Sequence, residues 1–136
     1  MEGKARWKVL VLVYFFMLVF AVTFQSIPPV LGFIVSALKI SHAQAGALMS
    51  LFALPGILIS IPTGILTDVY GPKRVGIVAL SIALVGTLLV AVGDRFSVLV
   101  FGRIVAGIGA LPIAVVASQT LAHWFADRDL GKAMGV

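Results

Sequence analysis

The chain has 136 residues, of which 61% are hydrophobic and 11% charged, with no cysteine and a formal net charge of +5. Soluble domains carry about 25% charged residues, so this composition and a mean hydropathy of +1.17 exclude a soluble globular domain. The lack of cysteine also excludes disulfides and thiolate metal sites.

Long apolar runs predict an all-α integral membrane protein. The runs are continuous rather than alternating, which is not typical of a transmembrane barrel, and a lipid-exposed backbone must otherwise be helical. A helix needs about 20 residues to cross the bilayer. Four such spans are predicted, at residues 9–38, 45–67, 75–92 and 96–121, and residues 133–136 look like the start of a fifth.

The first span contains Pro28-Pro29, where the missing N–H groups predict a bend or a break. Cations precede the span as they would in a secretory signal, but no small-residue cleavage site follows, so we interpret the segment as a retained helix. Just before the prolines lie the polar residues Thr23, Gln25 and Ser26, and Thr23 and Ser26 share one helical face.

Small residues, which allow close approach of helices in lipid, recur at helical spacing on the later spans. They are Gly56, Ser60 and Gly64 in the second span, Gly76, Ala79, Ala83 and Gly86 in the third, and Gly102, Ala106, Gly107, Gly109 and Ala110 in the fourth. The pattern predicts a tightly packed bundle. It fits helices that move against one another, and it fits static packing equally well.

The link between the second and third spans reads Gly64-Ile-Leu-Thr-Asp68-Val-Tyr-Gly71-Pro-Lys73-Arg74. An acidic residue ends one span, a tight turn is predicted at Gly71-Pro72, and two cations open the next span. So short and so charged a link is better suited to transmitting movement between two helices than to binding a ligand. We call this link, residues 64–74, the joint. As an alternative, these charges simply lie in solvent and complement the helix dipoles.

Arg103 is a cation well inside the fourth span, about seven residues or ~10 Å from its beginning. A charge at the centre of a membrane helix costs ~2.5–3.5 kcal/mol on insertion scales, so such residues usually serve a function. The alternative is that the long side chain snorkels to the nearer membrane surface. Ser118 and Gln119 are polar residues nearer the other end of the span.

Acidic residues are absent from the interior of all four predicted spans, so the sequence offers no intramembrane carboxylate for a proton relay. There is also no phosphate-binding glycine loop, nucleophile elbow or catalytic dyad. We therefore expect neither an enzyme nor a cofactor or metal site.

Lysine and arginine near the ends of the spans predict the orientation. Seven lie before the first span, between the second and third, or after the fourth, and two lie in the other links. This asymmetry predicts a multi-pass protein of the cell (plasma or inner) membrane with a cytoplasmic N-terminus. The cations are spread over helix ends, which does not favour nucleic-acid binding.

The joint resembles the loop between the second and third helices of major facilitator superfamily transporters, whose pattern is Gly-x-x-x-Asp-Arg/Lys-x-Gly-x-Arg/Lys-Arg/Lys. Gly64, Asp68, Gly71, Lys73 and Arg74 match it, and Val69 stands where the family usually has a cation. The segment around Arg103, with Gly107 and Gly109 four and six residues later, also resembles the fourth-helix motif of the family.

The resemblance implies that Asp68 and the loop cations form a cytoplasmic gate. In the family the aspartate engages a helix of the second half of the transporter, and a loop cation pairs with an acid after the fourth helix. Here that acid would be Asp129, although Leu130 departs from the usual Glu-Arg-Gly. For Arg103 it implies pairing with an acid during coupling or an approach to an anionic substrate.

The resemblance further implies the fold and the function. Residues 1–136 would be part of the N-terminal six-helix half of a twelve-helix transporter with a midplane site, and the C-terminal helices of that transporter are missing here. The first and fourth helices would line the cavity, with Thr23, Gln25, Ser26, Ser118 and Gln119 as candidate lining residues; hydrogen bonding between helices is the alternative for each.

The expected function is secondary transport of a small solute by alternating access, in a protein embedded in the lipid bilayer. A coupling ion such as H⁺ is one possibility. The motifs look most like those of the anion-transporting or multidrug branches, and we favour a small organic anion. The alternatives are a stand-alone four-helix membrane subunit and a non-functional truncated product.

Overall fold

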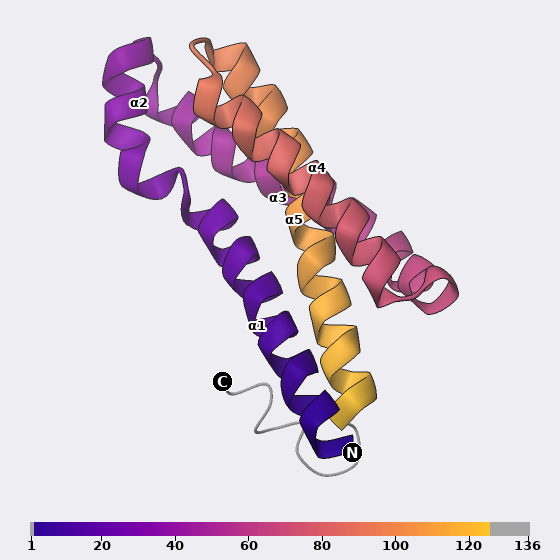
Figure 1. Ribbon diagram of the computed structural model, residues 1–136. Coiled ribbons are helices and arrows are strands. Elements are labelled where there is room, and N and C mark those ends of the chain that lie inside the picture. The colour runs from indigo at the N-terminus through magenta and orange to yellow at the C-terminus, as the bar shows by residue number, and fades with distance from the viewer. Residues whose placement is uncertain (1, 126–136) are drawn as a thin grey trace.

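A computed structural model describes residues 2–125, which fold into helices joined by short links (Figure 1). The elements are α1 (Glu2–Gln25), the 3₁₀ turn η1 (Pro28–Val30), α2 (Leu31–Leu38), α3 (His42–Tyr70), α4 (Pro72–Val92) and α5 (Phe96–Phe125). There is no strand between residues 2 and 125, so the prediction of an all-α membrane fold is confirmed. Four helical segments are long and apolar enough to cross a membrane: Trp7–Leu38, His42–Tyr70, Pro72–Val92 and Phe96–Phe125.

The first membrane segment is broken where the two prolines predict it. α1 ends at Gln25, η1 occupies Pro28–Val30, and α2 continues in the same segment to Leu38. Pro28 and Pro29 cannot donate the backbone hydrogen bonds that would continue α1. Ile27, in the break, is buried and anchors it to the bundle.

The helices run beyond the predicted spans because their ends are satisfied by local chemistry. Ser41 caps α3: its hydroxyl accepts from the Gln44 N–H at 3.1 Å, and its own N–H donates to Gln44 Oε1 at 2.9 Å. At the other end, Gly71 alone connects α3 to α4. Its φ of 83° is accessible to glycine without strain, and Pro72 begins α4 at a position that needs no N–H donor. The predicted tight turn is confirmed.

The short links make successive membrane segments run in opposite directions, so the start of α1, the α3–α4 turn and the end of α5 lie at the same end of the bundle (Figure 1). α5 is the central helix and packs against α1, α3 and α4. In Figure 1 it crosses α4 in its first half and runs beside α1 in its second half.

Glycines set the distance between α5 and its neighbours. A Cβ on Gly107 would strike the Phe52 carbonyl of α3, and one on Gly56 would strike Leu111 and lie 2.6 Å from the Gly107 oxygen. On the α4 side, a Cβ on Gly109 would strike the Ala83 nitrogen, and one on Gly102 would lie 2.9 Å from the Val90 nitrogen. Backbone therefore rests on backbone along two lines of α5.

The small-residue pattern predicted for the third span is confirmed, since Gly76, Ala79, Ala83 and Gly86 are the buried residues of α4. Of the small residues predicted to pack on α3, Gly56 is buried, whereas Ser60 and Gly64 are half-buried. The hydroxyl of Ser60 donates to the Ile57 carbonyl of its own helix at 2.7 Å.

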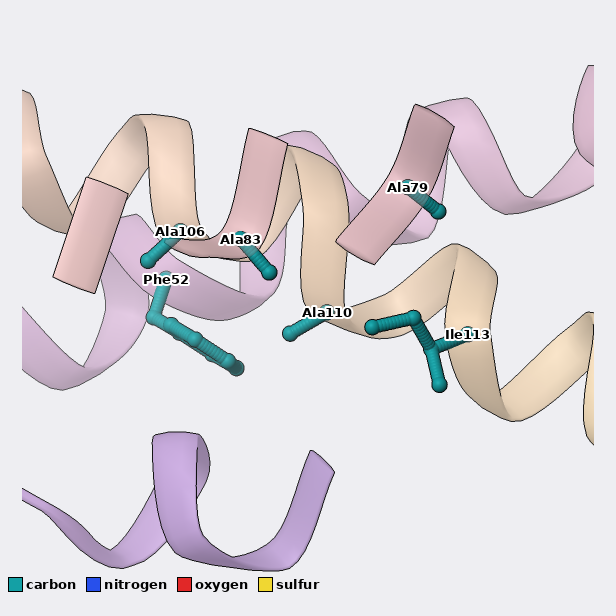
Figure 2. Packing of buried hydrophobic residues seen from close by; sticks show 6 residues of the cluster. All are labelled: Phe52, Ala79, Ala83, Ala106, Ala110 and Ile113. Atoms are coloured by element: carbon teal, nitrogen blue, oxygen red, sulfur yellow. The ribbon is translucent and has the colours of Figure 1, made fainter. Parts of the chain in front are cut away.

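The largest core cluster joins the three central helices (Figure 2). Its members are Phe52 of α3, Ala79 and Ala83 of α4, and Ala106, Ala110 and Ile113 of α5. Phe52 and Ile113 are the large side chains among four alanines, and Figure 2 shows Phe52 extending from α3 away from Ala83 and Ala106 and toward the side of Ala110. Large apolar side chains such as Phe33, Leu58 and Ile61 are more than 70% exposed, as expected of surfaces that face lipid.

Candidate functional site

Arg103 lies inside the bundle and is only 1% exposed. Its Nη1 donates to the Thr23 carbonyl of α1 at 3.1 Å, and its Nη2 lies 3.6 Å from the sulfur of Met49 in α3. The guanidinium carbon is 4.9 Å from the centroid of the Phe52 ring. The side chain therefore bridges α5 to α1 and α3 and does not take the snorkelling orientation. We call Arg103, Thr23, Met49 and Phe52 the arginine site.

The break in the first membrane segment makes a partner available to Arg103. Carbonyls in the last turn of a helix lack intrahelical donors, and α1 ends at Gln25, two residues after Thr23. The Thr23 carbonyl accepts from the Ser26 hydroxyl at 2.8 Å as well as from Arg103. The C-terminal end of a helix also carries a partial negative charge, so the guanidinium lies where a cation is favoured.

The guanidinium is not fully satisfied. A guanidinium offers five N–H donors, and the buried Nε of Arg103 has no hydrogen-bond partner among the described residues. The partners that it does have are a carbonyl, a thioether and an aromatic face. The arginine site thus holds a buried positive charge whose Nε–H has no acceptor among the described residues.

The other polar residues of α1 and α5 make mainly local contacts. The Thr23 hydroxyl donates to the Val19 carbonyl at 2.8 Å, and the Ser118 hydroxyl donates to the Ala114 carbonyl at 2.9 Å. Gln25 and Ser26 are exposed, and Ser118 is half-buried. Only the Thr23 backbone, among these, belongs to the arginine site.

Gln119 links α5 to the joint motif. Its Nε2 donates to the Gly64 carbonyl of α3 at 3.4 Å, while its buried Oε1 has no hydrogen-bond partner among the described residues. Gln119 also lines a cavity of about 250 Å³ together with Asp68 and Gly71 of the motif and His123 of α5. The structure therefore brings Gln119 to the joint and away from the arginine site.

The charged residues of the joint are accessible. Asp68, Lys73 and Arg74 are exposed, and Gly64 and Gly71 are half-buried. The predicted partner Asp129 lies outside the described residues, so its pairing with a loop cation stays a prediction.

The residues that complete the arginine site could not be identified from the sequence. Met49 and Phe52 read as ordinary apolar residues of the second span, and the Thr23 contact is made through its backbone. One signal was present: Leu48, Phe52 and Gly56 are spaced by four and share the buried face of α3. That row marks the face of α3 turned to α5, although it does not show an arginine opposite.

Four helical segments long and apolar enough to cross a membrane, three of them in close backbone contact, together with a buried cation, define a polytopic helical membrane protein with an internal polar site. The sequence profile described as Major Facilitator Superfamily matches residues 12–136. The chain belongs to this family.

Several characterised proteins are similar to the chain. The nitrate/nitrite transporter NrtP of Picosynechococcus sp. is 32% identical over 98% of this chain and 25% of its own length. The probable sulfoacetate transporter SauU of Cupriavidus necator is 32% identical over 71% of this chain and 23% of its own length. The quinolone resistance protein NorA of Staphylococcus aureus is 34% identical over 60% of this chain and 21% of its own length.

The chain thus spans about a quarter of the length of these relatives. No solved structure matches it significantly.

Proposed function

We propose that this chain forms part of the N-terminal half of a secondary active transporter that moves a small anion, preferably an organic one, by alternating access. The observation that carries the proposal is the buried guanidinium of Arg103 with an unpartnered Nε. A buried charge in a membrane is costly, and an anion that bound here would supply the missing acceptor through charge-assisted hydrogen bonds.

The names of two relatives agree with an anionic substrate, because nitrate, nitrite and sulfoacetate are all small anions. The quinolone resistance protein represents a different substrate class, so a multidrug transporter is the competing specificity. Arg103, the buried charged side chain within the four described spans, favours an anion over a cation.

Uptake and efflux in membranes that carry the native product of the gene would test this proposal. We expect transport of nitrate, nitrite or sulfoacetate and none of a quinolone. Arg103→Gln should lower anion transport at least tenfold while membrane insertion stays normal. Arg95→Gln is the matched control, because Arg95 is an exposed cation at the link that precedes α5. Unchanged anion transport in Arg103→Gln, or transport of the quinolone alone, would contradict the proposal.

For the joint we propose the role of a gate, formed by Gly64, Asp68, Gly71, Lys73, Arg74 and Asp129 on the cytoplasmic side. The single-residue link at Gly71 supports this role, because it ties the end of α3 directly to the start of α4. Asp68 is exposed at the end of α3 and lines the same small cavity as His123 of α5, so it lies where a closing contact can form or break. Exposed ion pairs contribute only ~0–1 kcal/mol each, which suits a gate that must reopen.

The gate is tested by Asp68→Asn, which keeps the shape of the side chain and removes its charge. We expect transport to fall at least tenfold with normal insertion. Asp94→Asn, at the opposite end of α4, is the control and should leave transport unchanged. Normal transport in Asp68→Asn would exclude the gate, even if Arg103 proved essential.

The orientation belongs to the same proposal. We place the start of α1, the joint and the end of α5 in the cytoplasm of a cell whose plasma or inner membrane holds the protein, in accordance with the excess of cations at those ends. Labelling of single cysteines at residues 73 and 95 with an impermeant reagent tests it. Only residue 95 should react from outside intact cells.

A further inference from the structure

A groove of about 380 Å³ opens between α3 and α4 and shares no lining residue with the small cavity that Asp68 lines. Its walls are apolar and follow one face of each helix, with Ile59 and Leu66 on α3 and Val78 and Ile82 on α4. α5 forms the floor with Ile108 and Pro112. The groove exists because α3 and α4 both pack on α5 and have few contacts with each other.

Apart from Thr63, the polar side chains that line the groove lie near one end. Tyr70 and Arg74 line that end, beside the α3–α4 turn, and both are exposed. Deeper inside, the hydroxyl of Thr63 donates to the Ile59 carbonyl of its own helix at 2.7 Å and is therefore not free for a ligand. The groove thus combines an apolar channel with a cationic and aromatic mouth.

The length of the groove corresponds to one leaflet of a bilayer. Its α3 wall runs from Ile59 to Tyr70, a rise of eleven helical steps, or ~16 Å at 1.5 Å per residue. The hydrocarbon core of a bilayer is ~30 Å thick, so the groove extends from the interface to about the midplane. Tyr70 then lies at the depth where aromatic belts occur.

The lining of the groove favours a hydrocarbon chain. Its walls are built from aliphatic side chains of α3 and α4, such as Ile59, Leu66 and Ile82. An acyl chain buries its apolar surface against such walls and needs no hydrogen-bond partner there.

We propose that this groove binds one acyl chain of an anionic phospholipid, whose headgroup phosphate pairs with Arg74. The charge at the mouth is complementary to the headgroup, since Arg74 is the charged residue among the lining side chains and Asp68 lines the other cavity. Basic positions between membrane helices on the cytoplasmic side are sites where anionic headgroups bind. The proposal is independent of the transported solute, and it rests on the proposed orientation only for the choice of leaflet.

Native mass spectrometry of the purified, delipidated protein would test the proposal, with palmitoyl-oleoyl phosphatidylglycerol and phosphatidylcholine as probes. The two lipids share acyl chains and differ in headgroup charge. We expect phosphatidylglycerol to bind at least tenfold more tightly. Arg74→Gln should remove that preference, and Val78→Trp should block binding of both lipids, because Val78 is a 59% exposed wall residue whose enlargement fills the groove without disturbing the core.

Two matched controls make the result specific. Lys73→Gln removes the neighbouring cation, which does not line the groove, and Val85→Trp enlarges a 53% exposed residue two turns further along the same helix, beyond the groove. Both should bind phosphatidylglycerol like the wild type.

Three outcomes would overturn the proposal. The first is equal affinity of the wild type for the two lipids, and the second is the same loss of binding in the controls as in Arg74→Gln and Val78→Trp. The third comes from a photo-crosslinker placed at residue 78 in native membranes: it would be a crosslink to protein with no lipid adduct. In the third case a crosslink to a second copy would assign the groove to a dimer interface. A crosslink within the native full product would assign it to another segment of that product.

Discussion

The two halves of α5 lie against the bundle in different ways. From Leu99 to Ile113, glycines and alanines bring the backbone of α5 against α3 and α4, and the one polar side chain buried among them is Arg103. From residue 114 to 125 the helix lies beside α1, and its polar residues Ser118, Gln119 and Thr120 are half-buried. The first half is held by close contact, whereas the second has room around its polar groups.

The two halves of α5 therefore differ in how tightly they hold their neighbours: the first half fixes the positions of the helices around Arg103, and the second leaves the joint more room to move. Backbone contact leaves little room for α3 and α4 to shift against the first half of α5, because packed interiors resist deformation. The second half contacts the joint through a 3.4 Å hydrogen bond from Gln119 and a cavity of about 250 Å³. If a transporter moves these helices, the arginine site is the part that keeps its geometry and the joint is the part that changes.

The largest effect should come from adding one methyl group to the close contact. In Gly107→Ala the new Cβ would strike the Phe52 carbonyl, so α3 and α5 must separate. Overpacking usually costs 1–3 kcal/mol, and a clash with backbone belongs at the upper end or above it, so we expect a loss of ~3 kcal/mol in the free energy of unfolding. Reversible unfolding in mixed micelles, followed by circular dichroism, measures it.

Gly46→Ala is the control for this prediction. Gly46 is also helical, but a Cβ there meets nothing within 4 Å. Alanine should stabilise the helix by ~0.5–1 kcal/mol through its greater helix propensity. Equal effects of the two substitutions would show that α5 does not touch α3 as described.

The arginine site offers the second test, a double-mutant cycle of Arg103→Met and Phe52→Leu. Arg103→Met alone should change the free energy of unfolding by less than ~1 kcal/mol, because burying an incompletely satisfied guanidinium already costs free energy and the Thr23 carbonyl keeps its bond from Ser26. Phe52→Leu should cost more in the presence of Arg103 than in its absence.

The difference between those two costs is the coupling energy, which we expect to be ~1–2 kcal/mol for a desolvated cation–π contact. Zero coupling would mean that Phe52 only fills space. A loss of several kcal/mol in Arg103→Met would mean that the arginine is kept for stability rather than for function.

Much of the fold could be predicted because membrane constraints act locally. The four spans, the break at Pro28-Pro29 and the turn at Gly71 follow from hydrophobic length, missing donors and backbone freedom. The buried face of α4 follows from the spacing of its glycines and alanines. In each case one segment contains all the information needed.

The pairing of residues between helices could not be predicted, because no local pattern encodes it. That Arg103 meets the end of α1 and the ring of Phe52 depends on how three helices cross. The grouping of Ser60 with Gly56 and Gly64 shows a related difficulty. Residues spaced by four drift by about 40° per step on a helix of 3.6 residues per turn, so the three do not share one contact equally, and Ser60 bonds to its own helix.

The smallest effect should follow changes at Gln119, which test the less tightly packed second half of α5. Its inter-helix bond is long, and membrane hydrogen bonds of this kind average ~0.6 kcal/mol. Gln119→Leu also removes the buried Oε1 that lacks a partner, which offsets the loss. We expect a change within about 0.5 kcal/mol in the free energy of unfolding, similar to that of Ser118→Ala, whose hydroxyl bonds only within α5.

A second measurement on Gln119→Leu shows whether this weak link still restrains the joint. A cysteine at Thr67, which lines the small cavity and is 5% exposed, should react faster with a thiol reagent once the bond to Gly64 is lost. The same cysteine in the Ser118→Ala background should react at the original rate. Unchanged reactivity together with a stability loss above 2 kcal/mol would mean that the second half of α5 is held as firmly as the first. In that case the freedom of movement proposed for the joint would have to come from the exposed charges beyond it rather than from the packing of α5.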